Sequence, residues 1–199
     1  MTIGNLSRNS YWGEGDDRAV RPALCTSTLI IGNDFRLLVD PSLADAGAMA
    51  AELDRRSGLK PGDITAVFMT HDHADHTAGT AHFPAARWLA APGVAGILNA
   101  SGRLPRPVEG AEDRLLGALD IIPTPGHTQT HHSLRMECEG MTIIVAGDAV
   151  MTRDFFRDRR GSFNAQNMER SARTIDELAA AADVIIPGHD NYFSTGRAG

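Results

Sequence analysis

The sequence has 199 residues, of which 42% are hydrophobic, and its formal net charge is −6. This length predicts a single domain over residues 1–199, in which residues 1–22 form an irregular N-terminal extension. The negative charge disfavours general nucleic-acid binding, and the 2 cysteines do not make a disulfide framework. No apolar run approaches the roughly 20 residues of a membrane span, and no apolar signal segment opens the chain, so we expect a cytoplasmic protein without membrane attachment.

The predicted elements alternate between β-rich runs and segments with helical periodicity. Residues 23–31 and 35–40 flank a Gly-Asn-Asp turn and predict a first hairpin, and residues 132–138 and 141–146 predict a second. The other predicted strands cover residues 64–69, 87–90, 119–123 and 183–186, and the predicted helices cover residues 43–56, 92–100 and 166–182. Strands interleaved with helices predict a mixed, layered domain.

Polar residues suited to metal binding follow several of the predicted strands. Each comes directly after an apolar strand or in the short turn that leaves it: His71, His127, Asp148 and His189. Layered folds bind their ligands at strand ends, because the loops there vary over a rigid sheet. We therefore expect these loops to converge on one cleft.

The densest motif is the segment His71-Asp72-His73-Ala74-Asp75-His76. In an extended segment residues two apart point to the same side, so His71 and His73 can reach one metal ion. Asp75 and His76 lie where the chain turns into a helix, within reach of a second ion. Imidazole and carboxylate together suit Zn²⁺, with iron and manganese as alternatives. A solvated histidine-rich loop is the alternative interpretation, and the other strand-end residues weigh against it.

The motifs THDHADH, PGHT, AGD and PGH, in this order, resemble the metallo-β-lactamase superfamily. The resemblance covers the chain from the first predicted hairpin to His189. It implies an α+β fold built as a four-layer αββα sandwich. It also implies two divalent metal ions, zinc being favoured over iron or manganese. Carried over position by position, the first ion is bound by His71, His73 and His127, the second by Asp75, His76 and His189, and Asp148 bridges both.

This ligand set implies a hydrolase that uses a metal-bridged hydroxide as its nucleophile. Asp75 is the expected catalytic residue, because it is placed to orient the nucleophile and to handle its proton. The expected substrate is a small molecule with an ester, thioester, lactone or similar bond. Asp40 resembles an acidic residue that the superfamily keeps at the end of a strand. It is either a hydrogen-bond partner of a ligand histidine or a turn residue before Pro41.

Weaker matches resemble the metallo-β-lactamase domain-containing protein 1 group within this superfamily. They include Pro61-Gly62-Asp63, Phe83-Pro84 and the run from Ala182 to His189. That group is linked to RNA cleavage in animals, so a nuclease or phosphodiesterase is the first alternative function, and the acidic charge counts against nucleic acid as a partner. A non-hydrolytic iron protein for redox or sensing is the second alternative. The oligomeric state stays open, and a homodimer is compatible with the resemblance.

Two departures from other branches of the superfamily narrow the expected substrate. Ala149-Val150-Met151-Thr152 stand where the lactonase branch usually carries a tyrosine, so a lactonase for quorum signals is not favoured. The chain ends ten residues after His189, without the helical domain that classical glyoxalase II enzymes use to hold glutathione thioesters.

Several further polar residues lie near these motifs. We expect Asp72, His82, His131 and His132 to be non-ligand residues, and Tyr192 either to reach a substrate oxygen or to pack. The stretch from Arg153 to Arg170 is rich in arginine and phenylalanine. It is either part of the substrate-binding wall or a solvated loop with internal salt bridges.

Overall fold

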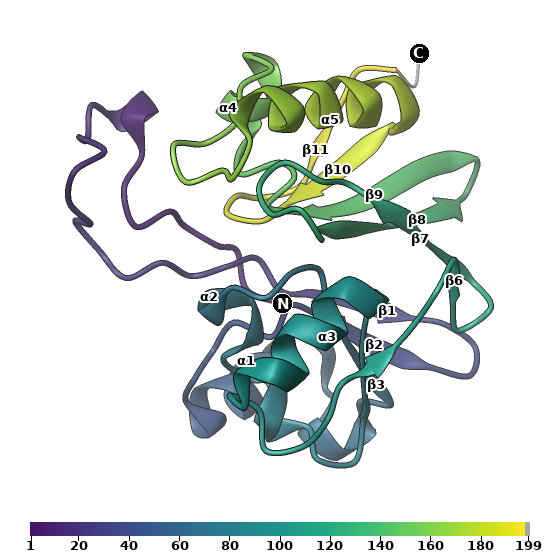
Figure 1. The fold of residues 1–199 in the computed structure, drawn as a ribbon. Helices are drawn as coiled ribbons and strands as arrows, with labels where there is room; N and C mark the ends of the chain where they lie inside the picture. The colour runs from purple at the N-terminus through teal and green to yellow at the C-terminus, as the bar shows by residue number, and fades with distance from the viewer. Residues whose placement is uncertain (198–199) are drawn as a thin grey trace.

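The computed structural model describes residues 1–197 and shows two β-sheets packed face to face, with helices on their outer sides (Figure 1). The first sheet has the order β1 (Thr28–Ile31), β2 (Arg36–Val39), β3 (Ala66–Met69), β4 (Arg87–Ala90), β5 (Glu109–Gly110). The second has the order β11 (Phe193–Ser194), β10 (Val184–Pro187), β9 (Met141–Gly147), β8 (His132–Cys138), β7 (Leu119–Pro123), β6 (Arg114–Leu115).

Helices cover both outer faces. Figure 1 shows α1 (Ala46–Ser57) and α3 (Pro92–Ser101) beside the first sheet, and α4 (Arg153–Arg157) and α5 (Met168–Ala181) above the second. The short helix α2 (Ala74–Thr77) follows β3. This arrangement confirms the predicted four-layer αββα sandwich. Within residues 1–197, no helix has the length and apolar character needed to cross a membrane.

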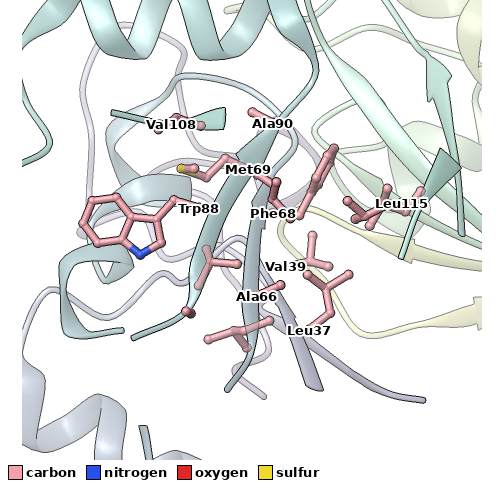
Figure 2. Close-up of a cluster of buried hydrophobic side chains, with 14 of the residues drawn as sticks. Leu37, Val39, Ala66, Phe68, Met69, Trp88, Ala90, Val108 and Leu115 are labelled. Carbon is pink, nitrogen blue, oxygen red and sulfur yellow. The ribbon is translucent and has the colours of Figure 1, made fainter. Parts of the chain in front are cut away.

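Apolar residues of both sheets form one core between them. Phe68 of β3 and Leu134 of β8 are fully buried in the same cluster, together with Leu115 of β6. In Figure 2, Phe68 points toward Leu115, whereas Trp88 lies on the opposite side of the first sheet. Successive side chains of a strand point to opposite faces, so one sheet contacts both the other sheet and its own helices.

The second sheet uses the same alternation against α5. Val145 of β9 belongs to the core between the sheets, whereas its neighbour Ile144 packs with Ile175 and Leu178 of α5. The apolar stripe of α5 is therefore directed at the outer face of this sheet, as its helical spacing predicts.

Most predicted elements are confirmed, and the differences have local causes. The first helix begins at Ala46, not at residue 43, because the Asp45 side chain caps it by accepting from the amide of Ala48 at 2.7 Å. The first strand begins at Thr28, because the amide of Thr26 instead donates to the carbonyl of Gly188 at 2.6 Å. The short elements β5, β6, α4 and β11 were not predicted, since two to five residues show no clear periodicity.

The direction of the strands places the site. The strands β7 and β9 both pair antiparallel with β8, and β10 pairs parallel with β9. All three therefore run the same way, and their carboxyl ends lie at one edge of the second sheet. The loops that carry His127, Asp148 and His189 leave from this edge.

The first 27 residues contact the body of the domain rather than extending from it. A β-bridge joins Asn5 to Leu24, and Leu6 is buried in a cluster with Met151 and Phe155. Figure 1 shows this segment running out beside α4 and returning to β1. The segment has little regular structure, but it packs against the strand-end loops.

Candidate metal centre

The structure brings all seven predicted ligands together at the strand-end edge. They form two groups in which one ligand atom per residue lies within 4.8 Å of the others: His71, His73, His127 and Asp148, and then Asp75, His76 and His189. Most of these side chains are buried, whereas His73 and Asp75 are partly exposed at the opening of a cleft. The loops therefore converge as the sequence predicts.

Asp148 lies between the two groups and directs one carboxylate oxygen at each. Its Oδ2 is 3.2 Å from His127 Nε2 and 3.8 Å from His71 Nε2. Its Oδ1 is 3.1 Å from His76 Nε2 and 3.3 Å from His189 Nε2. A single carboxylate thus contacts both groups, which is the arrangement expected of a bridging ligand.

The remaining contacts close each group. His127 Nε2 lies 3.0 Å from His73 Nδ1, and His189 Nε2 lies 3.6 Å from Asp75 Oδ2. Zinc–nitrogen bonds of about 2.0–2.1 Å in a tetrahedron place neighbouring ligand atoms about 3.3 Å apart. The distances of 3.0–3.8 Å between these side-chain atoms bracket that value.

Several of these atoms are buried without a hydrogen-bond partner among the described residues. They include His71 Nε2, His76 Nε2 and Asp148 Oδ1. Buried polar atoms nearly always have a partner, because leaving one unpaired costs about 1–3 kcal/mol. Buried nitrogen and oxygen atoms that converge without hydrogen-bond partners are suited to bind divalent cations.

Hydrogen bonds to the outer nitrogens orient the imidazoles. His76 Nδ1 donates to Asp40 Oδ2 at 2.9 Å, and His71 Nδ1 donates to the Thr70 hydroxyl at 3.1 Å. His189 Nδ1 donates to the carbonyls of Asn5 and Leu24 at 3.1 and 3.0 Å. A proton on Nδ1 leaves the lone pair of Nε2 directed into the site.

Asp40 holds this network together. It is buried, and it also accepts from the amide and hydroxyl of Thr70 at 2.8 and 2.7 Å. Its φ of 50° lies in the left-handed region, where a non-glycine residue is uncommon. Of the two interpretations of Asp40, the structure supports the partner of a ligand histidine.

The two groups differ in the protonation of their histidines. Burial lowers the pKa of His71 well below its usual value and that of His127 to about 4, so both imidazoles are neutral. Burial opposes ionisation of Asp148, but His76 and His189 hold its pKa well below the usual range. Burial would likewise lower the pKa of these two histidines, but Cys25 and Asp148 raise that of His76, and Asp148 raises that of His189. Neutral imidazole and ionised carboxylate are the forms that bind metals, so a cation at the Asp75, His76 and His189 group must displace protons from His76 and His189.

His131 lies beside the two groups but is not among the ligand atoms within reach. It is fully buried, its Nδ1 is 2.8 Å from the Thr124 hydroxyl, and its ring centre is 5.0 Å from that of His71. It therefore packs against a predicted ligand and lies outside both groups.

The other histidines near the motifs lie away from the site. His132 Nδ1 is 2.8 Å from the carbonyl of Thr130, and His82 Nε2 is 2.9 Å from that of Ala44. Tyr192 is 64% exposed and does not line the cleft. Asp72 faces Arg103.

The arginine-rich stretch contributes less to the cleft than the substrate-wall interpretation requires. Arg157 pairs with Asp154 and Asp158, and Arg159 pairs with Asp176, so these side chains form the salt bridges of the alternative interpretation. From this stretch, only Phe163 and Asn164 line the cleft.

Sequence reasoning missed the N-terminal part of the cleft wall. Leu6, Ser7, Arg8 and Ala23 line the same space as Asp75, Asp148 and His189. These residues lie in a polar segment without periodicity, so no local signal connects them with ligands more than 40 residues away.

Gly188 provides a test of this geometry. An added Cβ would overlap Asp148 Oδ1 and lie 3.0 Å from the carbonyl carbon of Gly147. We expect Gly188→Ala to displace the carboxylate and to weaken cation binding at least about tenfold, since overpacking costs about 1–3 kcal/mol. Chelator competition measures the affinity. Gly62→Ala is the control, because nothing lies within 4 Å of its added Cβ. Equal affinities in both variants would contradict this account.

Comparison with known proteins agrees with the fold. The family model of the Metallo-beta-lactamase superfamily matches residues 20–189. A dizinc quorum-quenching lactonase, AidC, has a similar structure, with a TM-score of 0.70 and 15% sequence identity over 84% of this chain and 72% of that chain.

Curated relatives carry two different names. Metallo-beta-lactamase domain-containing protein 1 of Homo sapiens is 34% identical over 152 residues, which cover 74% of this chain and 53% of the human protein. Hydroxyacylglutathione hydrolase of Anaeromyxobacter dehalogenans (strain 2CP-C) is 35% identical over 172 residues, covering 83% of this chain and 60% of that protein. This chain thus spans little more than half the length of these relatives. The match over residues 20–189 and the relatives together show that the chain belongs to the metallo-beta-lactamase superfamily.

Proposed function

We propose that this protein is a hydrolase that binds two divalent cations, with zinc favoured, and cleaves an ester, thioester, lactone or similar bond of a small molecule. The position of Asp148 carries the proposal, because its two oxygens face two separate groups of ligand atoms. His71, His73 and His127 would hold one cation with Asp148. The other would be held by Asp75, His76 and His189 with the same carboxylate.

Cations bound there would lower the pKa of water toward neutrality and polarise the oxygen of the scissile group. Asp75 is the residue suited to proton handling, because its carboxylate is 25% exposed where the cleft opens and lies 3.6 Å from His189. A carboxylate there can orient a water molecule and accept its proton. Leu6 and Met151 line the same space and limit access of bulk water.

The names of two similar proteins support a small substrate. The cleft beside the ligands has about 60 Å³ of space, which admits the reacting group of a substrate. One curated relative is named hydroxyacylglutathione hydrolase, and the lactonase AidC carries the product N-hexnoyl-L-homoserine. These names favour carbonyl substrates over phosphodiesters.

Metal analysis paired with a substrate panel tests the proposal. The panel is a thioester, a lactone, an aryl ester and bis-p-nitrophenyl phosphate. We expect about two zinc ions per chain and turnover of at least one carbonyl substrate, lost on chelation. Asp75→Ala should abolish turnover, whereas Asp72→Ala in the same motif should retain it, because Asp72 lies outside both groups.

Other results would overturn it in distinct ways. Turnover of the phosphodiester alone, with strongly salt-dependent RNA binding, would indicate a nuclease. Tightly bound iron without hydrolysis of any substrate would indicate a redox or sensor protein.

A further inference from the structure

Arg8 lies in the wall of the metal cleft. It lines the same space as His73, Asp75 and Asp148, and so does Phe163. The segment that carries it is fixed, because Leu6, two residues before Arg8, is buried against the strand-end loops. The guanidinium therefore has a defined position beside the ligands.

The charge of Arg8 has no carboxylate partner among residues 1–197. Its Nε is buried without a hydrogen bond, and its guanidinium lies over the ring of Phe163, 4.1 Å from the ring centre. The arginines of the neighbouring stretch differ, since Arg157 and Arg159 are paired with aspartates. Stacking on an aromatic ring uses the face of the guanidinium and leaves its edge free to donate hydrogen bonds.

Arg8 does not serve to neutralise the acidic ligands. No oxygen of Asp75 or Asp148 within the described residues comes near enough to pair with it, whereas the ligand histidines contact Asp148 at 3.1–3.8 Å. Cations in the two groups would offset these carboxylates as well. The positive charge of Arg8 is then available to a group that enters the cleft from outside.

We propose that Arg8 binds a carboxylate of the substrate and so selects small anionic esters or thioesters over neutral ones. This inference rests on the proposed function and adds the substrate class to it. A planar carboxylate fits the edge of a guanidinium through two parallel N–H···O hydrogen bonds. Phe163 holds the guanidinium plane, and Arg8 places the acid beside the scissile bond.

Binding and turnover together test the proposal. The binding probes are N-acetylglycine, N-acetyl-β-alanine and N-acetyl-4-aminobutyrate, each compared with its methyl amide by calorimetry on the zinc-loaded protein. The turnover probes are the S-acetyl thioesters of the corresponding mercapto acids and their methyl amides. The variants are Arg8→Gln and, as a matched control, the exposed Arg18→Gln of the same segment.

We expect at least one acid to bind, and its thioester to turn over, about tenfold or more better than the methyl amide. Arg8→Gln should remove this preference by weakening the acid alone, with metal content and the neutral partners unchanged, and Arg18→Gln should retain it. An equal loss for acids and amides, or a preference that persists in Arg8→Gln, would overturn the role of Arg8. Preferential binding of the acid that is lost in Arg8→Gln, without turnover of any thioester or of any substrate of the panel, would instead overturn the proposed hydrolase and leave the anion site standing.

Discussion

Asp148→Asn should abolish hydrolysis and reduce the number of bound cations. An amide has nearly the same shape as the carboxylate, but it presents one NH₂ group in place of an oxygen and carries no charge. Because each Asp148 oxygen faces a different group of ligands, at least one group would meet this NH₂ instead of an oxygen. We expect activity to fall by more than about a hundredfold. Loss of a residue that only hydrogen-bonds to a metal ligand typically costs about 10- to 100-fold, and Asp148 is itself a proposed ligand.

Cation stoichiometry by elemental analysis and turnover of the best panel substrate measure this effect. Asp54→Asn is the matched control, because Asp54 is exposed on α1 and its side chain makes no contact with the site. Far-ultraviolet circular dichroism separates loss of function from loss of fold. Unchanged stoichiometry and turnover in a folded Asp148→Asn variant would show that the carboxylate does not bridge the two groups.

The seven residues of the two groups could be predicted from the sequence because each belongs to a local pattern. His71 and His73 stand two apart after a buried strand, and His127, Asp148 and His189 follow apolar runs that end in a glycine turn. To predict that they converge, one must also infer that β7, β9 and β10 run in the same direction. This follows from the antiparallel pairing of β7 and β9 with β8 and from the crossover that makes β10 parallel to β9. The layered fold followed from the same alternation of strands and helices.

Contacts between distant segments without periodicity could not be predicted in this way. Nothing in the local sequence of Leu6 or Arg8 indicates that the N-terminal segment returns to the strand-end loops. The hydrogen bonds from His189 to the carbonyls of Asn5 and Leu24 depend on this return. Asp40 is an intermediate case, because a strand-end aspartate before proline fits a turn as well as a buried hydrogen-bond partner.

Asp40→Asn should weaken cation binding about 10- to 100-fold while leaving the fold intact. Asparagine tolerates the left-handed backbone that Asp40 adopts at φ 50°, and its size is nearly the same. Its one oxygen can still accept from the Thr70 amide, which now donates to Oδ1 at 2.8 Å. The NH₂ group then replaces Oδ2 and faces His76 Nδ1, so this nitrogen must accept a hydrogen bond instead of donating one.

The consequence is a change of tautomer at His76. With Nδ1 as the acceptor, the proton of a neutral imidazole moves to Nε2, which is the atom 3.1 Å from Asp148 Oδ1. A protonated Nε2 has no lone pair for a cation, so binding at the Asp75, His76 and His189 group must first overcome the cost of moving that proton. Chelator competition gives the affinity, and nitrogen NMR of labelled histidine distinguishes the two tautomers in the metal-free protein when it is recorded at a pH above the raised pKa of His76, where the imidazole is neutral. If the Asp40→Asn variant keeps the Nδ1–H tautomer at His76 and binds cations with wild-type affinity, the proposed role of Asp40 is contradicted. If it binds cations more weakly and gives an Nε2–H signal, the loss of affinity comes from the changed tautomer of the imidazole and not from unfolding.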